Sequence, residues 1–470
     1  MSTAPPGQPP PPLPAGFGLA LDPSVRRPRP EVLVGGSPIR VLRLRPAGVQ
    51  QVEGWARGEP IGPSPGAQAL ARRLLDAGIA QPRPNRTRHP SPGDVTVVIP
   101  VRDRAAGLEA TLSALGAESP VIVVDDGSTA PVQADGAEVI RRPSPGGPAA
   151  ARNDGWRAAA TDLIAFVDAD CEPAQGWLAT LLPHFADPAV AAVAPRIVSR
   201  AAGTPGWLAT YEQRRSSLDL GPREAPVRPG TTVAYVPTAA LTVRRQALLD
   251  ACGFDETLRY GEDVDLVWRL GQRGWRVRYE PAAHASHPAR TGLGPWLRQR
   301  HQYGRSAAPL AARHSRAVAP VAVSPWSAAA WGLLGAGYPL AGAGIAAATS
   351  VTLARRAGSD RATAAALARL AAAGHLRAGA ALAGAIRRAW LPPALVAAGA
   401  FCRLGRRAPA VALGAVLTLP SVVEWVRERP PGLGPLRWSA LTLADDLAYQ
   451  SGVWAGVVET HSAAALLPNW

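Results

Sequence analysis

Short apolar runs alternate with amphipathic stretches in the middle of the chain, and polar residues follow each apolar run. Residues 95–99, 121–124 and 163–167 have the length and the valine and isoleucine content of buried strands. Between the first two runs, Leu108 and Leu112 fall on one face of a predicted helix. Strands that alternate with helices predict an α/β fold, with a mostly parallel sheet and helices on its faces.

Acidic residues follow two of these predicted strands. Asp125 and Asp126 come directly after the second run, and Asp168 and Asp170 come directly after the third. In parallel sheets, ligands bind outside the carboxyl ends of the strands, so we expect these residues and the polar segment 101–103 at one edge. Three unrelated solvated loops are the alternative.

The carboxylates of Asp168 and Asp170 are spaced i, i+2 at the end of a strand. Carboxylate oxygens are ligands that Mg²⁺ and Mn²⁺ prefer. A divalent cation held there would neutralise the charge that builds on a leaving diphosphate. For an isolated Asp-x-Asp, a solvated turn or a helix cap is the alternative.

A third acidic cluster, at 260–266, precedes the start of a predicted helix. Glu262 and Asp263 stand where a carboxylate could face a cleft, and such a group near an acceptor hydroxyl would serve as a general base. Asp265 falls in the first turn of the helix, where acidic residues commonly interact with the helix dipole.

Five motifs along the chain resemble, in order, those of the family 2 inverting glycosyltransferases. They are Val-Val-Ile-Pro-x-Arg-Asp at 97–103, Val-Asp-Asp-Gly-Ser at 124–128, Gly-Gly-Pro-Ala-Ala-Ala-Arg-Asn at 146–153, Asp-Ala-Asp at 168–170 and Gly-Glu-Asp-Val-Asp at 261–265. The resemblance extends to 238–245 and 253–256. It covers roughly 94–305 and implies the GT-A (Rossmann-like) fold of that family.

The resemblance also implies roles for individual residues. It implies nucleotide-sugar contacts at Pro100, Asp125, Asp126, Arg152 and Asp168. It further implies Asp170 as a ligand of a divalent metal, Mn²⁺ or Mg²⁺, and Asp263 as the catalytic base. His287 falls where relatives place a histidine near the metal, and His284 is the alternative.

Within the family, the chain resembles the branch that belongs to the mycofactocin system. That branch implies transfer of a hexose, glucose, from a UDP-sugar to a hydroxyl of a small peptide-derived cofactor precursor, forming a β-linked glycan. A membrane glycosyltransferase with a cell-envelope polysaccharide or lipid acceptor stays open, as do a nucleotidyltransferase and a non-catalytic membrane scaffold. Segment 298–305 lacks the Trp of the Gln-x-x-Arg-Trp signature of processive relatives, so processivity also stays open.

Charge and cysteine content narrow the possible partners and the cellular compartment. All 50 basic residues are Arg, and the formal net charge is +15. The arginines are scattered and no nucleic-acid-binding module is visible, so we expect no nucleic-acid partner. Three widely spaced cysteines, Cys171, Cys252 and Cys402, indicate a reducing compartment. The first residues carry no basic-then-apolar export signal, which fits a catalytic domain on the cytoplasmic side.

The remaining chain divides by composition. Residues 1–15 are Pro-rich and predicted disordered, and 83–93 form a predicted linker before a GT-A domain at 94–310. Between them, residues 16–82 resemble a small winged-helix-like module, which would either recognise a peptide or extend the catalytic domain. Its predicted elements are strands at 17–21, 31–34 and 39–44 and a helix at 67–80.

Residues 311–470 form a predicted hydrophobic helical, membrane-associated region. The stretch 317–354 carries no charge. It is long enough for one span or for a hairpin kinked at Pro339. Arginines on both flanks favour cytoplasmic ends, so we expect the protein at the cytoplasmic face of the cell membrane. The later runs 389–402 and 408–423 are predicted to be buried helices or shallow membrane segments.

Overall fold

The computed structural model describes residues 11–85, 89–201, 206–357 and 360–469. The chain forms two compact units, Met1–Ala202 with Arg215–Ala289, and Gly203–Arg214 with Arg290–Trp470. Most of the predicted disordered segment lies outside the described residues. Leu13, however, is fully buried in the core of the small module, so ordered packing begins before residue 16.

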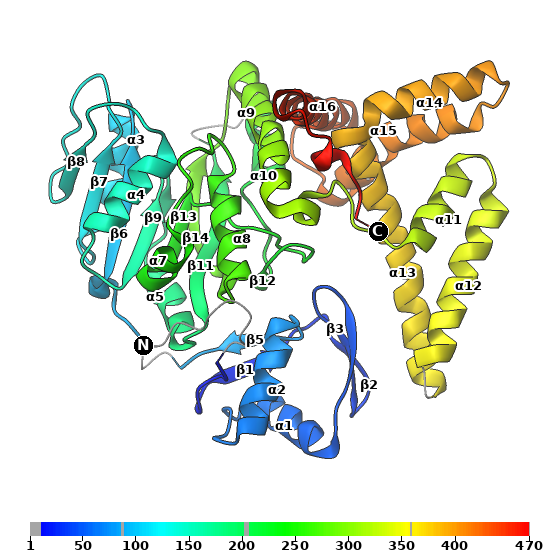
Figure 1. Ribbon diagram of the computed structural model, residues 1–470, viewed down its shortest axis with the longest axis horizontal. Helices are drawn as coiled ribbons and strands as arrows, with labels where there is room; N and C mark the ends of the chain where they lie inside the picture. Colours follow the sequence, from blue (N-terminus) through cyan, green and yellow to red (C-terminus); the bar gives the residue numbers. More distant parts are fainter. Residues whose placement is uncertain (1–10, 86–88, 202–205, 358–359, 470) are drawn as a thin grey trace. The chain divides into compact units, whose positions relative to one another are not determined.

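Within the described residues, the first unit is built on a nine-stranded sheet (Figure 1) of order β10-β14-β11-β13-β9-β6-β7-β8, with β12 paired to β14. The strands are β6 (Val95–Val101), β7 (Val121–Asp125), β8 (Glu138–Arg141), β9 (Leu163–Val167), β10 (Glu172–Pro173), β11 (Val190–Arg200), β12 (Ala225–Val227), β13 (Ala240–Arg244) and β14 (Arg276–Pro288). β6, β7, β8, β9, β11 and β14 run in one direction, and β10, β12 and β13 run in the other. The mostly parallel α/β sheet predicted from the sequence is confirmed.

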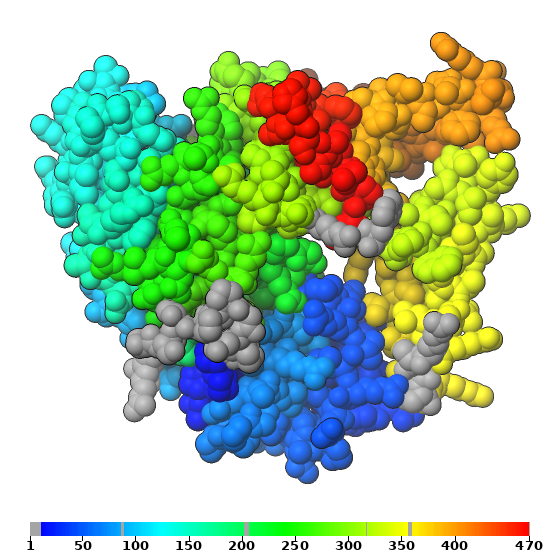
Figure 2. Space-filling view, in the orientation of Figure 1, coloured from blue at the N-terminus to red at the C-terminus, as the bar shows by residue number. Residues whose placement is uncertain are grey.

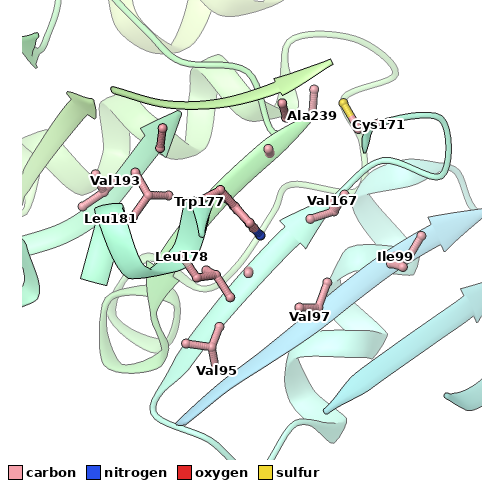
Figure 3. Packing of buried hydrophobic residues seen from close by; sticks show 14 of the residues in the cluster. Val95, Val97, Ile99, Val167, Cys171, Trp177, Leu178, Leu181, Val193 and Ala239 are labelled. Carbon is pink, nitrogen blue, oxygen red and sulfur yellow. The ribbon is translucent and has the colours of Figure 1, made fainter. Parts of the chain in front are cut away.

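Helices cover this sheet, and apolar strand residues fill the space beneath them. The helices are α3 (Ala105–Leu115), α4 (Pro148–Ala158), α5 (Trp177–Leu181), α7 (Arg245–Ala251) and α8 (Glu262–Gln272), with short turns η1 (Pro92–Asp94) and η2 (Leu182–Ala186). Val97 and Val167 from the strands share a cluster with Trp177 and Leu181 of α5 (Figure 3). Leu108, on the predicted apolar face of α3, is buried in the same cluster.

The small module forms a compact body of its own elements (Figure 2, blue). They are β1 (Gly18–Leu21), β2 (Arg26–Arg29), β3 (Val32–Gly35), β4 (Arg40–Arg43), α1 (Pro46–Ala56), α2 (Pro65–Asp76) and β5 (Ala80–Arg83). The helix predicted at 67–80 ends early, at Asp76, and β5 pairs antiparallel with β1 instead. Neither α1 nor β5 was predicted, because their apolar patterns are short and the pairing of β5 is to a distant strand.

Bidentate ion pairs join the small module to the catalytic sheet within the first unit. Arg72 donates to both carboxylate oxygens of Asp187 at 2.6 Å, and both side chains are buried. Arg276 at the start of β14 donates to both oxygens of Asp76 at 2.8 Å. The module therefore packs against the catalytic sheet, and its role, as an extension of the catalytic domain or in peptide recognition, stays a prediction.

The second unit is helical. Its elements are α6 (Trp207–Arg215), α9 (Leu293–Arg305), α10 (Ala307–His314), η3 (Ser315–Val318), α11 (Pro325–Gly335), α12 (Pro339–Ala357), α13 (Arg361–Ala385), the π-helical turn η4 (Ile386–Trp390), α14 (Leu391–Arg403), α15 (Ala408–Glu428), α16 (Pro435–Thr460) and η5 (Ala464–Leu466). The uncharged stretch 317–354 is not one continuous helix. It breaks before Pro339 into α11 and α12, which corresponds to the kinked hairpin among the two predicted arrangements.

Helices α9 and α16 approach each other so closely that only glycine fits at the crossing. A Cβ on Gly304 would lie 1.9 Å from the Tyr449 carbonyl oxygen, and a Cβ on Gly452 would lie 1.9 Å from that of His301. A buried ion pair between Arg300 and Asp445, at 3.0 Å, lies in the same contact. The C-terminal helix therefore belongs to the same packed unit as α9.

The outer helices of this unit expose many large apolar side chains. Of the described helices, α15 is the one long and apolar enough to cross a membrane, by length and composition, and 11% of its most apolar stretch is buried. Leu340 on α12 and Val396 on α14 are 87% and 74% exposed. The helix that meets this test is one of the later runs, which the sequence left as either buried helices or shallow membrane segments.

Candidate active site

The carboxyl ends of β6 and β7 meet because the two strands pair in parallel, with Val101 opposite Asp125. The loops that follow these two strands are hydrogen-bonded to each other. The Asp103 amide donates to the Ser128 hydroxyl at 3.0 Å, and the Thr129 amide donates to the Asp103 carboxylate at 2.8 Å. The polar segments 101–103 and 125–128 therefore form one continuous edge, as the strand order predicted.

Asp125 and Asp126 are both buried at this edge. Asp125 accepts hydrogen bonds from the Ser128 amide at 2.8 Å and from Arg141 at 2.9 Å. Burial raises the pKa of Asp125, but these bonds outweigh it and leave the pKa below its ordinary value.

The oxygens of Asp126 accept from the amides of Gly146 and Gly147 at 2.8 Å each. Both carboxylates thus fix the loops around the edge. Pro100, near the end of β6, is half-buried. Nucleotide contacts by Pro100, Asp125 and Asp126 stay predictions.

Asp170 and His287 come together because β10 pairs antiparallel with the end of β14, with Glu172 opposite Ser286. His287 Nε2 lies 3.5 Å from Asp170 Oδ1. The guanidinium of Arg104 contacts the other oxygen, Oδ2. His284 is exposed on β14, so the structure brings His287, and not the alternative, to the predicted metal ligand.

This donor set fits a divalent cation that arrives with a diphosphate. A carboxylate oxygen and an imidazole nitrogen are both ligands for Mn²⁺. Among the described residues, no group of three or more His, Cys, Asp and Glu side chains is gathered tightly enough to hold a metal. Cations of this kind are commonly held by one or two protein ligands together with substrate phosphates and water. Asp170 and His287 would supply two such ligands.

Arg152 lies buried on α4 and bridges two carboxylates. It donates to Glu262 at 3.0 Å and to Asp168 at 2.7 Å, and its guanidinium stands 5.6 Å from the centre of the Phe254 ring. Burial lowers the pKa of Arg152, but the charges of Asp168 and Glu262 outweigh it, so Arg152 stays cationic. The nucleotide contact predicted for Arg152 and Asp168 stays a prediction, while their observed partners are each other and Glu262.

Asp263 is the second residue of α8 and lies beside this cluster. Its carboxylate accepts from the Val264 amide at 2.8 Å. Burial, followed by the negative charge of Glu262, raises the pKa of Asp263 from 3.8 to about 7, with Asp168 adding to the effect and Arg152 opposing it. A carboxylate with this pKa is poised to accept a proton near neutral pH.

Comparison with known proteins identifies the family. Residues 96–249 match the profile of Glycosyl transferase family 2. The chain is 45% identical to the pre-mycofactocin glycosyltransferase of Mycobacterium tuberculosis (strain H37Rv) over 97% of this chain and 98% of that protein. The chain belongs to glycosyltransferase family 2. The nucleotidyltransferase and the non-catalytic scaffold are thereby set aside, and the mixed α/β sheet is the GT-A fold that the family implied.

Other relatives of this family 2 enzyme match less of the chain. The N-acetylglucosaminyl-diphospho-decaprenol L-rhamnosyltransferase of Mycobacterium tuberculosis is 37% identical over 23% of this chain and 29% of that protein. Among solved structures, a mannosyltransferase from Pyrobaculum calidifontis in complex with GDP-Man and Mn²⁺ covers 64% of this chain and 88% of that chain. Its sequence identity is 22% and its TM-score is 0.39.

Two neighbours of Asp263 in this glycosyltransferase have structural partners. Glu262 is held by Arg152, as described. Asp265 is buried and accepts from Arg269 Nε at 2.6 Å, and Arg269 in turn donates to the Gly253 carbonyl at 2.8 Å. Asp265 therefore ties α8 to the preceding turn. Within the described part of the chain, no guanidinium is hydrogen-bonded to Asp263, whose carboxylate accepts from the Val264 amide.

Asn153 and Arg104 were missed from the sequence. Asn153 holds the turn before α8: its side-chain amide donates to the Phe254 carbonyl at 2.8 Å, and its oxygen accepts from the Phe254 amide at 2.9 Å. Its position next to Arg152 in the Arg-Asn motif was the available signal. Arg104 follows the polar pair Arg102-Asp103, and nothing in the local pattern pointed to Asp170 as its partner.

Proposed function

We propose that this glycosyltransferase moves a hexose, glucose, from a UDP-sugar to a hydroxyl of the peptide-derived cofactor precursor of the mycofactocin system. The transfer inverts the anomeric carbon and gives a β-linked glycan. The observation that carries the chemistry is Asp263, a carboxylate with a pKa of about 7 next to the Arg152–Asp168 pair. The acceptor rests on the near-full-length likeness to a pre-mycofactocin glycosyltransferase.

The proposed reaction is a single displacement. Asp263 accepts the proton of the acceptor hydroxyl, whose oxygen forms a bond to the anomeric carbon from the face opposite the diphosphate. The bond from that carbon to the diphosphate oxygen breaks, and UDP leaves with the electron pair. Asp170 and His287 would hold the divalent cation, which supplies neutralisation of the diphosphate charge when bound.

Arg152 supports the division of roles among the acidic residues. Its guanidinium contacts both Asp168 and Glu262 directly. After burial, the negative charge of Glu262 is the next cause of the raised pKa of Asp263. A base with too low a pKa would hold a proton poorly. The raised pKa therefore suits Asp263 to accept the proton of the acceptor hydroxyl.

We also propose that the enzyme is associated with the cytoplasmic face of the membrane. The exposed apolar side chains of α12, α14 and α15 support this, since lipid is the medium that would cover them. The same surface favours a second candidate, transfer to a lipid acceptor of the cell envelope. The two candidates differ in the acceptor and share the chemistry.

The test uses the full chain in detergent with UDP-glucose, UDP-galactose, UDP-N-acetylglucosamine and GDP-mannose. Each donor is offered to the peptide-derived cofactor precursor and, separately, to polyprenyl phosphate. Mass spectrometry should detect hexose addition to the cofactor precursor from UDP-glucose, and NMR of the product should give a β-anomer. Transfer to polyprenyl phosphate alone supports the second candidate. An α-anomer, or transfer that persists in Asp263→Asn, contradicts the proposed mechanism.

A further inference from the structure

Each carboxylate oxygen of Asp170 contacts a different side chain, one a histidine and the other an arginine. Oδ1 faces His287 Nε2 at 3.5 Å, and Oδ2 contacts the guanidinium of Arg104. The Asp170 side chain is mostly buried, with 17% exposed, whereas the Arg104 side chain is 50% exposed. One carboxylate is therefore shared between the predicted metal position and a half-exposed arginine.

The backbone of Arg104 is fixed relative to the Asp-x-Asp loop. Arg104 immediately precedes α3, and three residues later Gly107 packs against the loop, where a Cβ would lie 2.8 Å from the Ala169 carbonyl oxygen. A larger residue at 107 would push α3 away from Asp170. The close packing thus fixes where the Arg104 side chain starts, while the half-exposed side chain has room to move.

We propose that Arg104 couples the metal to the sugar-nucleotide donor, with the diphosphate as its second ligand. Without donor, Arg104 neutralises part of the Asp170 charge that attracts a divalent cation. A diphosphate bound beside Asp170 carries more negative charge and matches the bidentate geometry of a guanidinium, so it draws Arg104 away from the carboxylate. The inference rests on the proposed function, because it takes Asp170 as the metal ligand.

The consequence is reciprocal. If the donor frees Asp170 for the cation, then the donor raises metal affinity, and by linkage the metal raises donor affinity by the same factor. Arg104 is a positioning residue in this scheme, because it acts on the site through Asp170 and the diphosphate. The two effects therefore have opposite signs. Removal of Arg104 strengthens the binding of the metal alone and weakens the binding of the nucleotide.

The test measures Mn²⁺ binding to the full chain in detergent by electron paramagnetic resonance of the free ion, with and without UDP. Arg104→Gln should bind Mn²⁺ alone about three- to fivefold more tightly, as expected for loss of a half-exposed competing charge. UDP affinity in saturating Mn²⁺ should fall about tenfold, the loss expected for a charge-assisted hydrogen bond. The coupling factor between Mn²⁺ and UDP should fall accordingly.

Arg102→Gln is the matched control, since Arg102 lies in the same loop, is 55% exposed, and has Asp103 rather than Asp170 as its neighbour. It should leave Mn²⁺ affinity unchanged. Arg104→Lys keeps the charge and should retain the weak binding of Mn²⁺ alone while losing part of the UDP affinity. Unchanged coupling in Arg104→Gln, or weaker Mn²⁺ binding without UDP, overturns the proposal. A wild-type chain that binds neither Mn²⁺ nor UDP contradicts the proposed function itself.

Discussion

In strand β9 of the catalytic sheet all five residues are buried, whereas in helix α15, with 21 residues, the buried ones are Leu413 and Ser421. Both segments are apolar. The strand has neighbours on both sides in the sheet and helices above it, so its apolar area is removed from water by the chain itself. The helix leaves most of its apolar area uncovered, at an expected cost of about 25 cal/mol per Å² in water.

Polar groups show the opposite arrangement. At the sheet edge, the side chains of Asp168 and Asp170 are 32% and 17% exposed, and Asp263 at the start of α8 is half-buried. In the C-terminal helices, polar groups face one another: His375 on α13 bonds the hydroxyls of Ser327 and Thr349, on α11 and α12, at 2.9 Å each. Hydrogen bonds between helices with apolar residues outside are typical of membrane bundles. The comparison teaches that apolar content alone does not distinguish a buried strand from a candidate membrane segment, and that the two regions differ in how much of their apolar surface the chain covers.

The largest effect expected in the sheet region comes from the metal. EDTA should reduce transfer to background, and Mn²⁺ or Mg²⁺ should restore it. Asp170→Asn should lose about 10²-fold or more in kcat, because several kcal/mol of charge neutralisation depend on this ligand. Glu172→Gln is the control, since Glu172 lies two residues on and pairs with Arg200 instead. Full activity after verified metal removal would contradict the metal role.

The next effect concerns the base. Asp263→Asn should retain UDP binding and lose about 10²–10⁴-fold in transfer rate. Asp265→Asn is its matched control two residues along α8. Because Asp265 forms a buried pair with Arg269, this change should instead destabilise the fold, by about 3–5 kcal/mol in urea unfolding. If the Asp265 variant kept its stability and lost transfer, the base would be misassigned.

A smaller effect is expected from pH. Asp263 must be ionised to accept a proton, so kcat/KM should fall about tenfold per pH unit below its pKa of about 7. The folded-state pKa lies above the ordinary 3.8, so this carboxyl contributes a stability that is lost as pH rises from 3.8 to about 7.

The stability half of this prediction can be read separately from activity. Asp263→Asn should raise the Tm above pH 7, relative to the wild type, and should give no such gain near pH 3. Differential scanning fluorimetry measures both. A wild-type rate that does not change between pH 5 and 7 would speak against a base with this pKa.

The smallest effect is expected in the helical region. Salt should not release the full chain from membranes, because screening acts on charged contacts and not on apolar ones. Leu340→Lys with Val396→Lys should shift part of the protein to the soluble fraction, at a cost of at most about 3 kcal/mol each. Leu249→Lys is the control, an exposed leucine (51%) on α7 of the catalytic unit, and should change nothing. Release of the full chain from membranes by high salt alone would contradict an apolar membrane contact of the helical region.

Much of the catalytic sheet was predictable from the sequence. The runs at 95–99, 121–124 and 163–167 are strands because their apolar pattern is local and continuous, and the carboxyl ends of parallel strands necessarily share an edge. The family followed from five motifs that occur along this chain in the same order as in family 2. These features depend on neighbours in sequence, or on rules that hold for any parallel sheet.

What only the tertiary structure decided are contacts between distant segments. The resemblance left His284 as an alternative to His287, and the pairing of β10 with β14 brings His287 to Asp170 across more than a hundred residues of sequence. Arg152 is buried under two carboxylates rather than open at the edge, which no periodicity indicates. In the tail, the absence of charge drew the membrane prediction to 317–354. That stretch breaks before Pro339 into two helices, and α15 is the described helix long and apolar enough to cross a membrane. An apolar run fixes only which side chains avoid water, and packing decides which partners they and the polar groups between them find.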